Sequence, residues 1–142
     1  METIECGSAT GVLQVDNDGV GTALYRGLML PSNFLAMGAL VMSAGLCRGA
    51  KGLLYRNDQA AICCDPVSMT AAYPTLAATL RSLPVAFVVN AGQSTLYEQV
   101  VQRAASVGLI RRAFYAHAEA REWLAETVDA LERNRGWWAT RR

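Results

Sequence analysis

The sequence predicts an α/β fold, in which a mixed sheet of about four or five strands begins with an antiparallel hairpin and is accompanied by about four helices. Two patterns lead to this fold class. In the first part of the chain, apolar residues alternate with a period of two, as in antiparallel strands with one buried face. Beyond Leu30, helical patterns alternate with short apolar segments, which indicates a parallel sheet with right-handed crossovers.

Length and composition predict one domain. The chain has 142 residues, of which 52% are hydrophobic and 18% charged, and this composition is sufficient for a buried core. Residues 1–132 are expected to form the domain, and residues 133–142 a tail rich in arginine and tryptophan. The formal net charge of +1 gives no electrostatic reason to expect nucleic acid as a partner.

The N-terminal strands are expected at residues 3–7, 11–16 and 21–27. The sequence "NDG" at residues 17–19 joins the last two of them. An apolar run on each side of such a turn is a hairpin signal, because Gly19 adopts the positive φ that a tight turn requires.

The first helix is predicted over residues 33–48, with Ser32 as its N-cap and Gly49 as its stop. It carries no charge before Arg48, and its apolar residues form two stripes, so more than one side of it should be covered. Part of this surface is therefore expected to pack against a second copy of the chain or another protein. The residues expected at this interface are Phe34, Met37, Val41, Met42, Trp137 and Trp138.

The remaining elements alternate. Strands are expected at residues 52–56, 85–90 and 110–115, and helices at 73–83, from Ser94 or Thr95 to Gly108, and from His117 to a stop at Gly136. The segment "VAFVVN" at 85–90 is the clearest strand. Its unbroken apolar run requires burial on both faces, which predicts an interior position in a parallel sheet.

A membrane span is not expected. Residues 27–47 carry no charge and reach about the spanning length, but "PSN" at residues 31–33 interrupts them after a few apolar residues. Glu2 and Glu5 stand where a signal peptide would be basic and then apolar. These features favour a cytoplasmic protein with free thiols.

A metal centre or another cofactor is not expected either. The cysteines lack CxxC spacing, and the single histidine, His117, cannot complete a site with scattered thiols. The cysteines are Cys6, Cys47, Cys63 and Cys64.

One short stretch, "YRNDQAAICCDPVSM" at residues 55–69, concentrates reactive side chains. A nucleophilic thiol needs a base or a cation nearby, and nothing in the sequence places His117 beside Cys63. The stretch is therefore interpreted as a connection from a strand to a helix, in which Asp65 or Ser68 caps the helix. No catalytic residue, and no enzymatic activity, is predicted from it.

Polar residues follow the strand at 85–90 and lead into a helix. The segment "NAGQST" has no glycine-rich phosphate framework, yet ligands collect at this edge of an open α/β sheet. A small anionic ligand at this edge is an open alternative, with Asn90, Gln93, Ser94 and Thr95 as its candidate contacts.

Three segments resemble the SpoIIAA-like proteins of the STAS (sulphate transporter and anti-sigma-factor antagonist) superfamily. "ALYRGLMLPSNFLAM" is similar to their strand, loop and capped helix, and "LPVAFVVNAGQ" to their central parallel strand. "IRRAFYAHAEAREWLAE" resembles their last strand and the "eeAxxWL" that opens the last helix. The resemblance covers roughly residues 3 to 128.

The resemblance implies a bacterial, non-enzymatic regulatory module that binds a protein partner. In the anti-sigma antagonists, a phosphorylated serine follows an aspartate at a helix start. Asp65 matches that aspartate, but Pro66 occupies the acceptor position and Ser68 comes two positions later, so the usual phosphoserine switch is not expected. The alternative is a protein that binds a small lipid or anion with its strand ends and its apolar first helix. An enclosed apolar cavity beneath that helix would favour the ligand-binding alternative, and a flat exposed apolar face would favour the interaction module.

Overall fold

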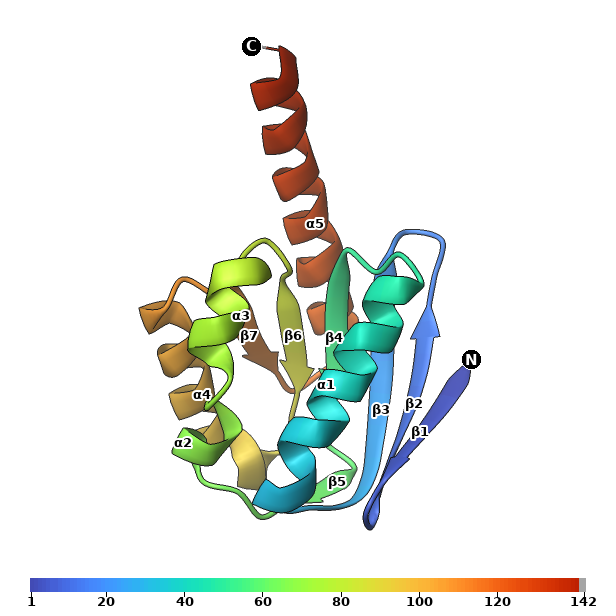
Figure 1. Cartoon of the computed structure of the whole chain (residues 1–142), viewed down its shortest axis with the longest axis vertical. Coiled ribbons are helices and arrows are strands. Elements are labelled where there is room, and N and C mark those ends of the chain that lie inside the picture. Colours follow the sequence, from blue (N-terminus) through green and yellow to red (C-terminus); the bar gives the residue numbers. More distant parts are fainter. Residues whose placement is uncertain (141–142) are drawn as a thin grey trace.

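The computed structural model describes the backbone of residues 1–140 and the side chains of residues 1–135. Within this part, one mixed sheet contains seven strands in the order β1-β2-β3-β4-β6-β7, with β5 paired to the far end of β3 (Figure 1). The strands are β1 (Glu2–Cys6), β2 (Ala9–Val15), β3 (Val20–Met29), β4 (Gly52–Arg56), β5 (Ala60–Ile62), β6 (Val85–Val88) and β7 (Arg111–Phe114).

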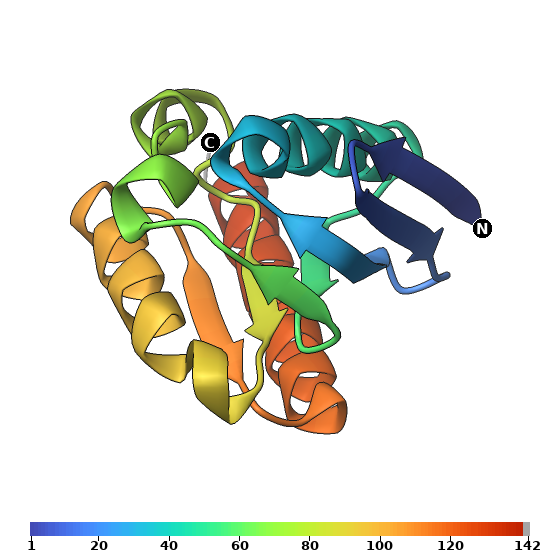
Figure 2. The ribbon, with the colours of Figure 1, turned by 90° about the horizontal axis from the view of Figure 1, so that it is seen from below.

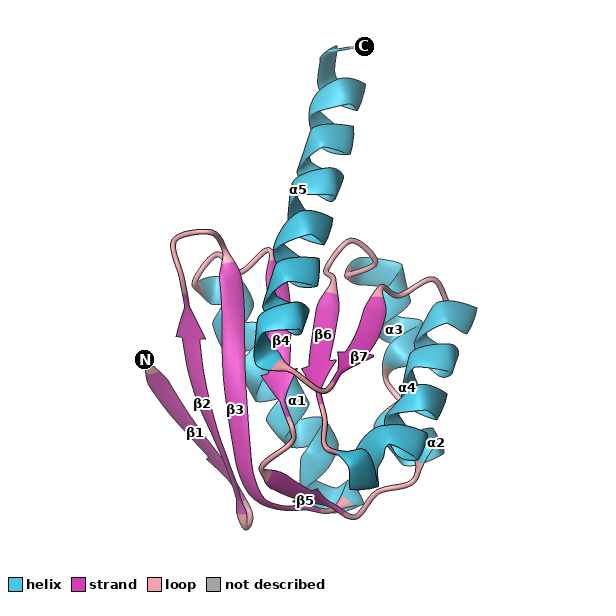
Figure 3. Cartoon of the chain, turned by 180° about the vertical axis from the view of Figure 1, so that it is seen from behind, coloured by secondary structure: helices cyan, strands magenta, loops and turns pink. Residues whose placement is uncertain are grey.

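The helices lie on the two faces of this sheet. One face is covered by α1 (Pro31–Cys47), α2 (Pro66–Met69), α3 (Tyr73–Thr79) and α4 (Ser94–Ser106), and the other by α5 (His117–Thr140) alone (Figure 2). Seen from behind, α5 crosses β4 and β6 and leaves the back of β1 and β2 without a helix (Figure 3). Its first turns also pack against Val20 at the start of β3. Both the predicted fold class and the N-terminal hairpin are confirmed.

The strand pairing follows the predicted change from antiparallel to parallel. The pairs β1–β2 and β2–β3 are antiparallel, and all later pairs are parallel. Gly19 has a φ of 82° in the turn before β3, and the Asp16 carboxylate accepts hydrogen bonds from the backbone of Asp18 and Val20. The hairpin is thus closed by the residues that predicted it.

The strand β6 is interior, as predicted. It lies between β4 and β7, and each of its residues is buried. The sheet has seven strands, more than the four or five expected. The short strand β5 was not predicted, and β1, β2 and β3 all belong to the same sheet as the parallel strands.

The start of α1 differs from the prediction. Its N-cap is Leu30, and the side chain that caps it is Asn33, whose Oδ1 accepts from the Leu30 N–H at 2.7 Å. The Asn33 amide also donates to the carbonyl oxygens of Cys6 and Leu28, at 3.1 Å each. A proline at the first position is compatible with a helix start, so Ser32 is not needed as a cap. The predicted stop is correct, since Gly49 has a φ of 82°.

Other helix ends also differ. The α3 helix ends at Thr79 rather than at residue 83, and α5 continues through Gly136 to Thr140 (Figure 1). The α4 helix is entered through a 3-10 turn, η1 (Ala91–Gln93), capped by Asn90, and neither Ser94 nor Thr95 caps it. None of the helices within residues 1–140 has the length and apolar character needed to cross a membrane.

Candidate functional site

A row of aromatic side chains crosses the sheet beneath α1 and α3. Tyr25 on β3, Tyr55 on β4 and Phe87 on β6 form this aromatic row, with ring centroids 5.5 and 6.1 Å apart. The strand register produces it, because Tyr55 pairs with Phe87 on the neighbouring parallel strand. Tyr97 of α4 continues the row, 5.0 Å from Phe87.

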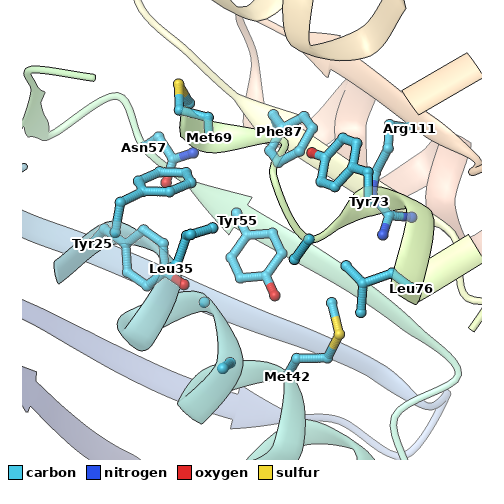
Figure 4. A pocket seen from close by; sticks show the side chains of 14 residues that line it. Tyr25, Leu35, Met42, Tyr55, Asn57, Met69, Tyr73, Leu76, Phe87 and Arg111 are labelled. Carbon is cyan, nitrogen blue, oxygen red and sulfur yellow. The ribbon is translucent and has the colours of Figure 1, made fainter. Parts of the chain in front are cut away.

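A cavity of about 130 Å³ lies between this floor and the helices α1 and α3, and we call it the α1–α3 cavity (Figure 4). Apolar side chains of both helices form its roof and leave it partly open to solvent. Its lining residues are Tyr25, Phe34, Leu35, Gly38, Ala39, Met42, Tyr55, Asn57, Met69, Ala72, Tyr73, Leu76, Phe87 and Arg111.

One cation lines the cavity. Arg111 is the first residue of β7, is only 8% exposed, and lies beside Tyr73 and Leu76 in Figure 4. Its Nη1 donates to the carbonyl oxygens of Leu83 and Ile110 at 2.9 and 3.1 Å. The guanidinium carbon lies 5.7 Å from the ring centroid of Tyr73, which is a cation–π contact. Among the side chains of residues 1–135, no carboxylate pairs with Arg111.

Two uncharged polar atoms in the lining lack hydrogen-bond partners. They are the hydroxyl of Tyr25 and the Oδ1 of Asn57, and both side chains are buried, at 3% and 1% exposure. The amide nitrogen of Asn57 is satisfied, because it donates to the hydroxyl of Tyr97. A buried polar atom without a partner is costly and rare in folded proteins, and both of these atoms belong to residues that line the cavity.

The tyrosines that surround the cavity stay neutral at physiological pH. Burial raises the pKa of Tyr25, Tyr55, Tyr73 and Tyr97, and the positive charge of Arg111 only partly offsets this rise at Tyr55 and Tyr73. Burial also lowers the pKa of Arg111, but an arginine remains protonated in proteins. The cavity therefore presents an apolar surface, neutral hydroxyl groups and one fixed positive charge.

The stretch at residues 55–69 runs from the end of β4 through β5 into α2, and the polar pair at its end serves the backbone. Asp65 is the N-cap of α2: its carboxylate accepts from the backbone N–H of Ser68 at 3.1 Å and from the Ser68 hydroxyl at 2.5 Å. These hydrogen bonds lower the pKa of Asp65. The predicted cap is confirmed, and a phosphate-accepting role for Ser68 is not tested by this arrangement.

The adjacent cysteines also lie in this connection. Cys63 is exposed and Cys64 is half-buried, with its Sγ 3.5 Å from the carbonyl oxygen of Met29. Burial raises the pKa of the Cys64 thiol, and the neighbouring Cys63 and Asp65 add to this rise. A raised pKa disfavours the thiolate, so this environment does not activate Cys64 as a nucleophile.

The polar residues after β6 connect strand ends. Asn90 and Gln93 exchange side-chain-to-backbone hydrogen bonds at 3.1 Å each, and the Gln93 amide donates to the carbonyl oxygens of Asn57 and Ala60. The Ser94 hydroxyl donates to a carbonyl of η1, and Thr95 is exposed. None of these four residues lines the α1–α3 cavity, so their ligand contacts stay a prediction.

The two stripes of α1 have different surroundings. Met37 and Val41 are buried in the core, whereas Phe34 and Met42 are half-buried beside the cavity. Beyond them, Leu35, Leu40 and Leu46 are 38%, 49% and 38% exposed, so the side chains of residues 1–135 leave these three leucines partly uncovered. Trp137 and Trp138 lie outside the residues whose side chains are described.

Sequence reasoning missed the polar residues of the cavity, which are Tyr25, Tyr55, Asn57, Tyr73 and Arg111. The only signal in the sequence was a basic residue in a short strand that had to be buried. Because Arg111 and Arg112 are adjacent, alternation alone did not indicate which of them faces inward.

A cluster of three or more histidine, cysteine, aspartate or glutamate side chains suited to a metal ion is not found in the part of the chain described here. No protein-family model matches the chain, and no relative is found among curated proteins.

Proposed function

We propose that the protein is a non-enzymatic binding module that takes a small, mostly apolar molecule into the α1–α3 cavity. The observation that carries this proposal is the cavity itself, which has a roof of apolar residues from α1 and α3 and a floor formed by the aromatic row. The ligand-binding alternative predicts an enclosed apolar cavity beneath the first helix, and the α1–α3 cavity lies beneath that helix and is apolar but partly open to solvent. A volume of about 130 Å³ is close to that of an apolar cavity known to hold one benzene ring.

Titration with toluene tests this proposal, because toluene is apolar and of the right size. The reporters are the methyl signals of Met42 and Met69, which line the cavity, in ¹H–¹³C spectra of the full chain. We expect their chemical shifts to change saturably, while the shift of Met29, which is buried away from the cavity, stays constant. Equal changes at all methionines, or none at Met42 and Met69, would contradict the proposal.

A second candidate function is protein interaction through α1. The exposed Leu35, Leu40 and Leu46 lie on a helix without a charged residue from Pro31 to Cys47, and such a surface favours association. The resemblance to anti-sigma-factor antagonists supports a regulatory interaction of this kind, with another protein or with a second copy of the chain. The described cysteines form no disulfide, which supports a cytoplasmic location. Light scattering over a range of protein concentrations measures self-association.

A further inference from the structure

We infer that the molecule bound in the α1–α3 cavity is a small carboxylic acid with an apolar body, and that its carboxylate pairs with Arg111. This inference rests on the proposed function and adds the chemical class of the ligand. Three features of the site support it: the unpaired buried cation, the free edge of its guanidinium, and the apolar character of the remaining lining.

The first feature is the charge of Arg111. Its side chain is 8% exposed and has no carboxylate partner within residues 1–135. A buried charge is costly unless an opposite charge or several hydrogen bonds compensate for it. The two backbone carbonyl oxygens and the ring of Tyr73 compensate for part of that cost, but they carry no full negative charge.

The second feature is the direction of the free donors. Both backbone hydrogen bonds of Arg111 come from Nη1, so the edge formed by Nε and Nη2 has no backbone acceptor. The neutral Tyr73 hydroxyl is a hydrogen-bonding neighbour of the guanidinium, and a ligand at this edge would share the guanidinium with it. A guanidinium edge presents two parallel N–H groups, and a carboxylate accepts both of them with its two oxygens. An acid therefore fits this edge better than a neutral amide or alcohol does.

The third feature is the rest of the lining. The aromatic row forms the floor and Met42 and Leu76 belong to the roof, so the body of the ligand has to be apolar (Figure 4). The volume limits the body to about one ring.

Benzoate and benzamide form the matched pair of probes, since they have nearly the same shape and differ in charge. We expect the full chain to bind benzoate about tenfold more tightly than benzamide, or more, as measured by calorimetric or NMR titration. The preference should disappear in Arg111→Met. It should persist in Arg112→Met, which removes the exposed neighbouring arginine of the same strand.

Toluene separates the ways in which the experiment can fail. If toluene binds but benzoate is not preferred over benzamide, or if the preference survives in Arg111→Met, the inference is wrong and the proposed function stands. If neither toluene nor benzoate binds, the proposed function fails and the inference with it. Toluene binding to Arg111→Met also shows that the variant has kept its cavity. If Arg111→Met does not fold, the inference is tested by comparing benzoate and benzamide binding in the wild type and in Arg111→Lys. Lysine keeps the charge without the paired donors, so the preference for benzoate should be smaller in that variant.

Discussion

The guanidinium of Arg111 lies against the ring of Tyr73, 5.7 Å from its centroid, and thereby links β7 to α3 at one end of the cavity. Tyr73 is the first residue of α3, and the Tyr73 ring and the backbone carbonyl of Leu83 both hold the guanidinium. A cation that is fixed in this way is already oriented for an anion, so little conformational freedom is lost on binding.

Replacement of Tyr73 tests its positioning role. Tyr73→Leu removes the cation–π contact, and we expect the affinity for benzoate to fall by several-fold, because the guanidinium is no longer held against a ring. The affinity for toluene should change less, since toluene does not contact a charge. Tyr73→Phe is the matched control, because it keeps the ring and removes only the hydroxyl that hydrogen-bonds to Arg111, so it should keep the preference for benzoate over benzamide. Equal losses for toluene and benzoate would indicate a general collapse of the cavity.

A cavity-filling substitution tests the roof. Gly38 lies on α1 in the cavity lining, and a Cβ built there has no neighbour within 4 Å. We expect Gly38→Leu to stabilise the fold by about 1–2 kcal/mol, from helix propensity and added apolar contact, and to weaken toluene binding. Ala36→Leu is the control, because Ala36 is exposed on the same helix outside the cavity. Thermal unfolding and the toluene titration measure the two effects, and unchanged toluene binding in Gly38→Leu would place the site elsewhere.

The fold was largely predictable because its signals are local. The buried run of β6, the glycine at the stop of α1 and the turn at Gly19 are each specified by a few neighbouring residues. The cap of α1 is not specified by neighbouring residues alone. Asn33 hydrogen-bonds to Leu30 nearby, but also to the carbonyl oxygen of Cys6 on β1, which is 27 residues from Asn33 in sequence. The short strand β5 likewise exists only through its pairing with the end of β3.

The candidate site could not be predicted for the same reason. The aromatic row depends on the register of three parallel strands, and no local pattern specifies that register. The inward direction of Arg111 is decided by its pairing with Val85 on β6, which puts Arg112 on the outside. The residues that sequence reasoning did select after β6, such as Asn90 and Gln93, are polar because they join strand ends.

The buried tyrosines predict a loss of stability at alkaline pH. Their pKa values in the folded state are raised above the unfolded value of about 10, so above that pH the unfolded chain binds fewer protons than the folded one. The free energy of unfolding should then fall as the pH rises, by at most about 1.4 kcal/mol per pH unit for each buried tyrosine. We expect ultraviolet absorbance of tyrosinate from these residues to appear together with the loss of the circular dichroism signal. Ionisation of Tyr25, Tyr55 and Tyr97 near pH 10 in a folded chain would contradict their burial.

The exposed leucines of α1 predict self-association that one charge can disrupt. Leu40 is 49% exposed on a helix without charges, and Leu40→Glu would place a carboxylate within the expected contact. We expect light scattering to show a dimer of the wild type at high concentration and a shift of Leu40→Glu toward the monomer. Gln102→Glu on α4 adds the same charge at an exposed site away from α1 and should leave the association unchanged. A wild type that stays monomeric throughout would contradict self-association through α1.

The hydrogen bonds between Asp65 and Ser68 predict that this turn has a structural role only. The Ser68 hydroxyl donates to the Asp65 carboxylate, and that carboxylate caps α2 through the Ser68 backbone. Asp65→Ala removes the cap, so we expect a lower melting temperature, whereas Ser68→Ala keeps the backbone hydrogen bond and should change it less. Because the pKa of Asp65 is lowered in the folded state, the contribution of the cap is present above the unfolded pKa and is lost as the pH falls through the folded one. The difference in melting temperature between wild type and Asp65→Ala should therefore shrink in acid.

Partner binding and toluene binding should be the same in wild type and Ser68→Ala, and the same again in the double replacement Cys63→Ser/Cys64→Ser. If Ser68→Ala alone loses both a covalently attached phosphate and partner binding, measured by mass spectrometry and pull-down from the host, then the regulatory serine lies two positions after the expected site.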